Sequence, residues 1–325
     1  MMKLRGTTSS WNRFLFALVA FAFAAFLLWK NGGSAPLTRR EKRGDPSPSP
    51  TQWAESDRAA CEAWTFPYAS ARPPYFLTSV ILLRIHKRSK AKLTSRELRQ
   101  WLFYQRYMGI EHVYLYDAYL YANESQRANV SKFIDNGFVT YVDWHEHNPY
   151  TIQGTQVAAY QHCIDHYKTE TEWQVAIDID EYPFSPVDRD PGFLSRYVRK
   201  FDVEHEKVSE ICMQNYLFLG WPLWERELLI DRLWRRTPKR SNQLVKPIYR
   251  TANVQAQVHH NYALKGRSMD APDAELRLNH YWGARLQNWG KDTPEVLNMT
   301  IVDKGMEYIV QKFKKCAKWT QYYMS

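Results

Sequence analysis

The chain has 325 residues, of which 45% are hydrophobic and 15% aromatic, so it is too long for a mini-protein and too rich in core-forming side chains to be disordered throughout. Lysine and arginine outnumber aspartate and glutamate by 44 to 34, which gives a net charge of +10. Residues 1–60 hold 9 basic and 4 acidic side chains, so half of the excess lies in the first sixth of the chain. The mild excess that remains suits an anionic small ligand, and we expect no nucleic-acid partner because no recognised binding module is present.

The N-terminal segment contains an unbroken apolar run of sixteen residues, Phe14–Trp29. A helix of this length spans ~24 Å, which is tolerable in the thinner membranes of the early secretory pathway. We predict a cytoplasmic tail over 1–13 and a transmembrane signal anchor over 14–29, which makes the protein a single-pass type II membrane protein. The alternative is a signal peptide cleaved near Gly33-Ser34-Ala35, where small residues have the required spacing.

Residues 30–58 predict an extended stem, because Pro, Ser and charged residues dominate there without apolar periodicity. A single domain then occupies 59–325. Acceptor patterns for N-glycosylation begin at Asn123, Asn129 and Asn298. The four cysteines allow three full disulfide pairings, and the alternative is that some of them are buried thiols. Both features favour a lumenal location for the body of the protein.

The body alternates strand and helix patterns in chain order. A capping box at Thr94–Glu97 opens a helix that Gly109 ends. Apolar, β-branched or alternating segments predict strands over 75–85, 110–116, 138–144 and 173–179, and helical patterns occupy 130–135 and 155–167. This alternation predicts an α/β fold with a mostly parallel central sheet and helices on both faces, in which ligands bind beyond the carboxyl ends of the strands.

The sharpest functional signal is the acidic end of the strand predicted over 173–179. Asp178 and Asp180 occupy alternate positions, so a strand that continues through them points both carboxylates to one side, and Glu181 adds a third. Two such carboxylates predict a site for Mn²⁺ or Mg²⁺. Three adjacent acids would repel one another unless a cation or basic side chains compensated for them.

The stretch 160–184, YQHCIDHYKTETEWQVAIDIDEYPF, resembles the core of glycosyltransferase family 92 and of related family-2-like enzymes. The resemblance covers about residues 75–290, and departs from the family pattern at Gln100 and Gln105, where the family has Glu and His, and at Thr251, where it has Pro. Further segments that match in order are LRQWLFYQRYMGIEHVYLYD (98–117), ICMQNYLFLG (211–220), KPIYRTANVQAQVHH (246–260) and LRLNHY (276–281).

What the resemblance implies is a GT-A fold with a Rossmann-like nucleotide half, and an inverting transfer of a sugar, with UDP-galactose as the expected donor, to a glycan or glycoprotein in the Golgi. By position, Asp180 would hold the metal ion, and Asp178 would be shared between the metal and the ribose. His259 and His280 are both candidates for a late histidine at the metal or diphosphate. The resemblance also implies that Asp117 faces the nucleotide. Arg84, Lys246 and Arg250 are candidates for contacts with the diphosphate or the base, because basic side chains bind phosphate groups.

An inverting transfer needs a general base that deprotonates the acceptor hydroxyl. The segment 221–232 holds three candidates, Glu225, Glu227 and Asp231, and we select Glu225 because it lies nearest to the loop at 220–222. Two tryptophans of the same segment, at positions 221 and 224, suit either a sugar-stacking platform or core packing.

Three other function classes compete with this interpretation. A phosphoryl hydrolase would need a Thr or Val directly after Asp180 and a later acidic pair, and Glu181-Tyr182-Pro183 supplies neither. A catalytically inactive glycan-binding or scaffold relative is compatible with the departures at Gln100 and Gln105. A nucleic-acid-binding protein would show a steep salt dependence.

Overall fold

The computed structural model of the chain describes residues 72–89, 91–147, 152–240, 242–255, 262–263, 265–285 and 294–324, together with Cys61. The predicted tail, signal anchor and stem lie outside these residues. Within them, no helix combines the length and the apolar character needed to cross a membrane.

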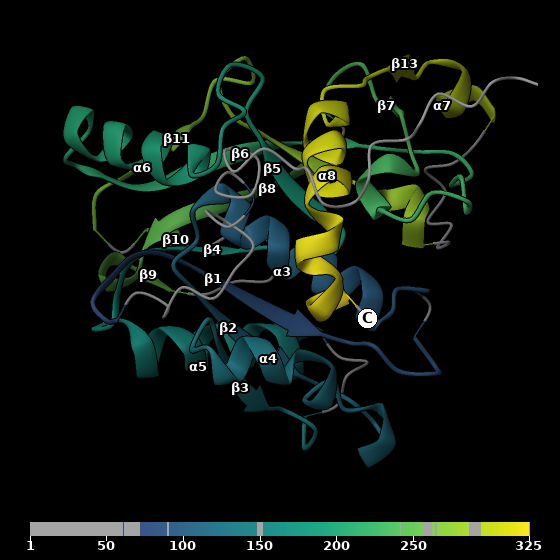
Figure 1. The fold of residues 1–325 in the computed structure, drawn as a ribbon. Helices are drawn as coiled ribbons and strands as arrows, with labels where there is room; N and C mark the ends of the chain where they lie inside the picture. Colours follow the sequence, from purple (N-terminus) through teal and green to yellow (C-terminus); the bar gives the residue numbers. More distant parts are fainter. Residues whose placement is uncertain are drawn as a thin grey trace, which may run out of the picture. The chain divides into compact units, whose positions relative to one another are not determined.

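The helices and strands alternate along the chain, as the sequence predicts (Figure 1). The strands are β1 (Tyr75–Leu83), β2 (His112–Asp117), β3 (Val139–Asp143), β4 (Thr171–Ala176), β5 (Glu181–Phe184), β6 (Val208–Leu217), β7 (Arg235–Arg236), β8 (Asn242–Arg250), β9 (Val254–Gln255), β10 (Tyr262–Ala263), β11 (Arg267–Asp270), β12 (Arg277–His280) and β13 (Ile301–Val302). The α-helices are α3 (Ser95–Met108), α4 (Ser131–Asp135), α5 (Ala158–Tyr167), α6 (Phe193–Glu204), α7 (Pro294–Asn298) and α8 (Glu307–Met324). Shorter helical turns are η1 (Ala122–Glu124), η2 (Ala128–Val130), η3 (Ile152–Val157), η4 (Leu229–Asp231), η5 (Thr251–Asn253) and η6 (Trp282–Arg285).

A nine-stranded sheet organises the fold, in the order β3-β2-β1-β4-β8-β6-β12-β5, with β11 beside β6. Strands β3, β2, β1 and β4 are parallel to one another, and β8 is antiparallel to both of its neighbours. Strand β12 is parallel to β6, and β5 is antiparallel to β12. The prediction of an α/β fold with a mostly parallel sheet is confirmed, and the carboxyl ends of β1, β2, β4 and β6 point to the same edge.

Both faces of the sheet are covered by helices, because apolar side chains alternate along the central strands. Val80 and Tyr114 belong to the buried cluster that α5 completes. Their neighbours Ile81 and Leu115 belong to the larger cluster on the other face, to which α3 and α8 contribute. Figure 1 shows α5 on one side of β1 and α8 on the other.

Helix α3 begins and ends where the sequence predicts. The Thr94 hydroxyl accepts from the N–H of Arg96 at 3.2 Å, and the Glu97 carboxylate accepts from the N–H of Thr94 at 2.9 Å, which completes the capping box. Gly109 ends the helix with a φ of 93°, and a Cβ there would lie 2.9 Å from the Cα of Gly192. Only glycine therefore fits between α3 and the start of α6.

The strand predicted over 173–179 is shorter than expected, since β4 ends at Ala176. Residues 178–181 form a turn, in which the N–H of Glu181 donates to the carbonyl of Asp178 at 3.0 Å, and β5 begins at Glu181. The prediction that strand alternation points Asp178 and Asp180 to one side is therefore wrong. The helix predicted over 155–167 also differs, because its first part is the π-helical turn η3.

The same turn requires the sheet to curl. In a flat sheet β5 would lie about 19 Å from β4, because four strand spacings separate them. A hydrogen-bonded turn brings its ends within about 7 Å of each other. The sheet must therefore bend so that β5 and its neighbour β12 return to the carboxyl end of β4.

One disulfide joins Cys61, which precedes β1, to Cys316 in α8, across a sequence separation of 255 residues. The other two cysteines, Cys163 and Cys212, are free and buried. None of the three full pairings therefore occurs. The disulfide attaches the segment before the sheet to the C-terminal helix.

We predict that Cys316→Ser lowers the free energy of unfolding by about 2–4 kcal/mol, because it releases a long closed loop in the unfolded chain. Urea denaturation with and without dithiothreitol measures this. The reductant should destabilise the wild type and Cys212→Ala, and leave Cys316→Ser unchanged. A count of four titratable thiols in the denatured, unreduced wild type would show that the disulfide is absent.

Candidate functional site

Three strands converge on the residues Asp178–Glu181, which we call the acidic turn. The turn follows the carboxyl end of β4, and its last residue pairs with His280 at the end of β12. The N–H of Tyr281 donates to the carbonyl of Asp180 at 2.8 Å, and His280 in turn lies in register with Leu217 at the end of β6. Backbone hydrogen bonds thus bring segments 100 residues apart in the sequence to one point.

Lys246 on β8 is the cation of the acidic turn. Its Nζ lies 3.3 Å from the Asp178 Oδ2 and 3.1 Å from the Glu181 Oε2, and its side chain is buried. Burial on its own would lower the pKa of Lys246, but the carboxylates of Asp178 and Glu181 raise it above its ordinary value. The ammonium group is therefore charged at neutral pH.

Glu181 is also buried, and burial raises the pKa of its carboxyl group despite the nearby Lys246 ammonium. Its Oε2 accepts a hydrogen bond from the N–H of Asp178 at 2.8 Å. Glu181 thus holds both the backbone of the turn and the Lys246 side chain. Its contacts are those of a residue that supports the site.

His280 is the partner of the second aspartate. Its Nε2 lies 3.1 Å from the Asp180 Oδ2, and its Nδ1 lies 3.3 Å from the Asn215 Nδ2 and 3.5 Å from the Glu181 Oε1. The imidazole ring thus stands between the carboxylates of Asp180 and Glu181. All four side chains are buried. The structure therefore brings Asp180 and His280 together, as the metal prediction requires.

Access to the site is through Asp178. The exposed fraction of its side chain is 25%, whereas that of Asp180 and of Glu181 is 1%. The three carboxylates outnumber the single lysine, so the turn keeps an excess of negative charge when His280 is neutral. Such an excess favours a further cation.

The donor atoms of this site fit a hard divalent ion in part. Neighbouring ligands of an octahedral ion lie about 3 Å apart at metal–ligand distances of ~2.1 Å, which is close to the separation of Asp180 and His280. In the part of the chain that the structure describes, however, no three Asp, Glu, His or Cys side chains form a group that could hold a metal ion. Lys246 instead neutralises Asp178, and His259 lies outside the described residues.

Tyr160 of α5 is a further residue near the acidic turn. Burial, and to a smaller extent the Asp178 carboxylate, raises the pKa of Tyr160 to about 12. Its hydroxyl therefore stays neutral at physiological pH. The hydroxyl accepts from the Gln156 amide at 3.2 Å. Tyr160 therefore offers a neutral donor beside the carboxylates.

Arg84 and Asp117 lie at the same edge of the sheet as the acidic turn. Arg84 follows β1, and Asp117 is the last residue of the neighbouring strand β2. Asp117, in register with Leu83, is buried, and its Oδ2 accepts from the N–H of Gln126 at 2.6 Å and from the Tyr141 hydroxyl at 2.7 Å. Burial raises the pKa of Asp117 in spite of these donors. Arg84 directly follows β1 and is half-buried. Contact of either residue with a nucleotide stays a prediction.

Arg250 does not join the site, because β8 is antiparallel to β4. It lies in register with Trp173, five residues before Asp178 and so about 16 Å away along the strand. There it forms ion pairs with Glu172, at 3.0 Å, and with Asp202. The predicted contact of Arg250 with the diphosphate does not fit this placement, whereas Lys246, four residues earlier, reaches the turn.

The predicted base, Glu225, lies in the loop that follows β6. This loop begins at the same edge of the sheet as the acidic turn. Its side chain is exposed, as is that of Glu227. Asp231, the third candidate, is buried in ion pairs with Lys314 at 2.8 Å and Arg226 at 3.4 Å, so it stabilises the fold.

The loop is anchored although its tip is exposed. Gln100 of α3 donates to the carbonyl of Glu227 and accepts from the N–H of Leu229, both at 3.0 Å. At its start, a Cβ on Gly283 would lie 2.5 Å from the carbonyl oxygen of Gly220, so the loop packs closely on the turn after β12. Between these anchors the Trp221 and Trp224 side chains are exposed, and neither belongs to the core.

Two residues of the site are missing from the sequence-based interpretation. Asn215 follows Gln214 inside the apolar strand 208–217, and a polar pair in such a run is a signal that could have indicated a buried contact. Tyr160 gave no signal, because an aromatic residue in an amphipathic helix is ordinarily part of the core.

The described fold and site define a class: a mixed α/β protein with an acidic turn at the carboxyl edge of its sheet. The sequence model of glycosyltransferase family 92 matches residues 93–318. A glycosyltransferase family 92 protein of Arabidopsis thaliana is 24% identical over 200 residues, which are 57% of this chain and 32% of that protein, so the chain spans about a third of that relative. This chain belongs to glycosyltransferase family 92.

Solved structures with a similar arrangement are more distant. Residues 1–349 of Staphylococcus aureus TarS share 12% identity at a TM-score of 0.38, over 63% of this chain and 60% of that one. The TarS complex with UDP-GlcNAc gives 12% and 0.37, over 75% and 71%. The 4-diphosphocytidyl-2C-methyl-D-erythritol synthase of Anaerococcus prevotii gives 11% and 0.30, over 55% and 71%. At these TM-scores the likenesses support no functional argument.

We predict that Lys246→Met lowers the free energy of unfolding by about 3 kcal/mol at pH 7, because it leaves buried carboxylates without their cation. The difference in the free energy of unfolding between the wild type and Lys246→Met should become smaller as the pH falls toward about 4.3, the pKa of an ordinary glutamate. The pKa of folded Glu181 is raised, and losing the lysine raises it further, so the folded variant takes up a proton before the unfolded chain does.

Urea denaturation of both proteins at pH 7 and pH 5 tests this. The matched control is Lys200→Met, which removes an exposed lysine of α6 and should cost under about 0.5 kcal/mol. An equal loss of unfolding free energy at pH 7 and pH 5 would show that the pKa of Glu181 does not depend on Lys246.

Proposed function

We propose that the protein is a metal-dependent, inverting glycosyltransferase that moves a sugar from a nucleotide donor, with UDP-galactose as the proposed donor, onto a glycan or glycoprotein. The observation that supports this best is the acidic turn, in which two buried basic groups, Lys246 and His280, face carboxylates at the carboxyl edge of the sheet. Membership of glycosyltransferase family 92 gives the class of reaction. In open α/β sheets this edge is where ligands bind.

The leaving group of such a transfer is a nucleoside diphosphate, whose charge has to be neutralised as the sugar departs. A Mn²⁺ or Mg²⁺ ion at Asp180 and His280, with Asp178 beside it, would supply Lewis-acid stabilisation of that diphosphate. Lys246 orients the Asp178 carboxylate through its 3.3 Å contact. Asn215, whose Nδ2 lies 3.3 Å from the His280 Nδ1, helps to hold the imidazole ring with its Nε2 toward Asp180.

The acceptor would bind at the loop after β6. The exposed faces of Trp221 and Trp224 are suited to the apolar side of a pyranose ring. Glu225, exposed in the same loop, would take the proton of the acceptor hydroxyl as general base. Because the loop and the acidic turn share one edge of the sheet, donor and acceptor would meet there.

The cellular setting is part of the same proposal. The apolar run 14–29 would anchor the protein in the Golgi membrane as a single-pass type II protein, with the stem 30–58 and the catalytic domain in the lumen. The Cys61–Cys316 disulfide fits an oxidising compartment.

The contacts of Gln100 do not favour the alternative that the protein is a catalytically inactive glycan-binding or scaffold relative. This residue, one of the departures from the family pattern, holds the backbone of the loop after β6 through both ends of its amide. Gln100 therefore has a structural role in the loop after β6.

We predict that Asp180→Asn abolishes release of UDP from UDP-galactose, and that the wild type loses this activity in EDTA and regains it with Mn²⁺. The amide keeps the size of the side chain and removes the charge that faces His280. Nucleotide release by the full chain measures activity, and circular dichroism confirms folding. Undiminished release by a folded Asp180→Asn protein would rule out the acidic turn as the donor site.

We predict that Glu225→Gln lowers kcat about 100-fold or more, because general bases contribute roughly 10²–10⁴-fold to such rates. Glu227→Gln is the matched control, because Glu227 is an equally exposed glutamate of the same loop. It should change kcat less than about twofold. Equal effects of the two substitutions would remove Glu225 from the mechanism.

A further inference from the structure

A cavity of about 380 Å³ lies on the sheet face opposite to the acidic turn. Gln214 and Tyr216 of β6 line it, and along the strand they alternate with Asn215, which contacts His280. Because successive side chains of a strand point to opposite faces, the cavity and the acidic turn are on different sides of the sheet. It is therefore a separate candidate site.

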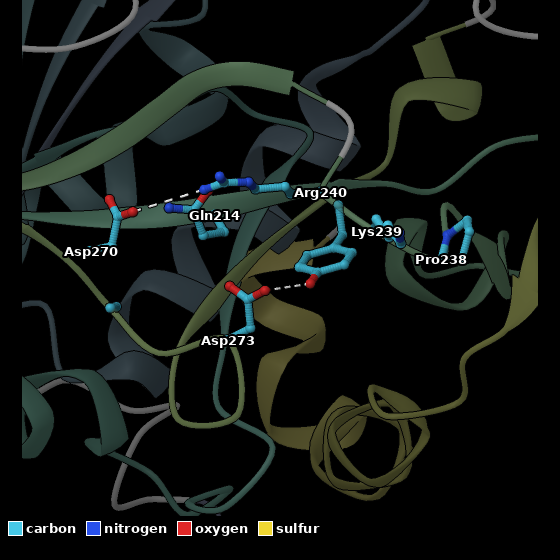
Figure 2. A pocket seen from close by; sticks show the side chains of 8 residues that line it. Gln214, Pro238, Lys239, Arg240, Asp270 and Asp273 are labelled. Carbon is cyan, nitrogen blue, oxygen red and sulfur yellow. Dashed lines mark hydrogen bonds and ion pairs between the residues drawn. The ribbon is translucent and has the colours of Figure 1, made fainter.

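Three segments build the walls of this cavity, as Figure 2 shows. Strand β6 supplies Tyr216, whose hydroxyl donates to the Asp273 Oδ2 of the β11–β12 connection at 2.5 Å. The loop before β8 supplies Arg240, whose Nη1 donates to the Gln214 Oε1 at 3.0 Å and lies 3.8 Å from Asp270. The wall is thus held by side-chain contacts between distant parts of the chain.

The lining is polar but has no net charge. Lys239 and Arg240 are balanced by Asp270 and Asp273. A phosphate would face the two carboxylates, and a metal ion would face the two basic groups, so neither kind of ion is favoured. A neutral ligand with several hydroxyl groups can donate to the carboxylates and accept from the basic side chains at once.

Gln214 supplies a second, independent observation. It is 4% exposed, its Oε1 accepts from Arg240, and its Nε2 has no hydrogen-bond partner among the described residues. A buried amide donor without a partner is costly, by roughly 1–3 kcal/mol. A hydroxyl oxygen of a bound ligand would remove that cost.

We propose that this cavity is a second carbohydrate-binding site, which takes a neutral sugar unit of a glycan. Its volume is at the lower end of the ~300–1,000 Å³ that ligand pockets occupy, which suits one or two sugar units. The site goes beyond the proposed transfer reaction and does not depend on it. It would let the protein hold a glycan away from the edge where the donor binds.

The test measures binding of three neutral probes to the full chain by saturation-transfer NMR: methyl β-galactoside, methyl α-mannoside and N-acetylglucosamine. The pocket variant carries Arg240→Ala with Asp270→Ala, which removes one charge of each sign. The matched control carries Lys200→Ala with Glu204→Ala, an ion pair of similar exposure on α6. At least one probe should bind to the wild type and the control alike, and about tenfold or more weakly to the pocket variant, since two polar contacts are lost.

Pro238→Trp is a second variant, which fills the cavity without changing its charges and should also weaken binding. Thermal melting of all variants confirms that they fold. The proposal is overturned if none of the probes binds, if the pocket variants bind as well as the control, or if inorganic phosphate displaces the sugar. Asp180→Asn separates the two sites: it should keep sugar binding, and loss of binding in that variant alone would assign the sugar to the acidic turn.

Discussion

The structure depends on how three carboxylates within four residues are kept in a largely buried turn. Lys246 bridges Asp178 and Glu181, and His280 faces Asp180. A buried carboxylate without a partner costs several kcal/mol, so the turn could not fold as it does if either basic residue were elsewhere. The positions of β8 and β12, which supply these residues, are therefore tied to the acidic turn.

The topology explains how two strands far along the chain reach this point. Strand β8 enters antiparallel between β4 and β6, so its middle residue Lys246 reaches the carboxyl end of β4, whereas its last residue, Arg250, lies beside Trp173 inside β4. The acidic turn reverses the chain into β5, which curls the sheet and brings the end of β12 beside Asp180. An arrangement of this kind concentrates charge at one edge and leaves the faces to apolar packing.

The local part of this fold could be predicted from the sequence, because its signals are local. The capping box at Thr94, the glycine at 109 and the apolar alternation of β1 and β2 each depend on neighbouring residues, and the elements formed as expected. The acidic motif was found for the same reason. Its geometry was not, because a strand and a tight turn place Asp178 and Asp180 differently, and the periodicity of the sequence does not record where the strand ends.

The long-range part of the site could be predicted only in fragments. His280 was identified through the family resemblance, and Lys246 as a basic side chain that could bind a phosphate, but their separate partners depend on register between strands that are distant in sequence. Arg250 was assigned to the site on the same ground as Lys246, and the antiparallel direction of β8 shows that Arg250 lies beside Trp173 while Lys246 reaches the acidic turn. Sequence order alone does not determine strand direction.

The proposed function requires that the acidic turn bind a nucleotide sugar through its diphosphate. Isothermal titration of UDP into the full chain, with and without Mn²⁺, is the most direct measurement. We expect binding that requires the ion in the wild type and is lost in Asp180→Asn, while the pocket variant on the opposite face of the sheet binds as the wild type does. Equal affinity of Asp180→Asn and the wild type for UDP, or no binding to either protein, would contradict the account.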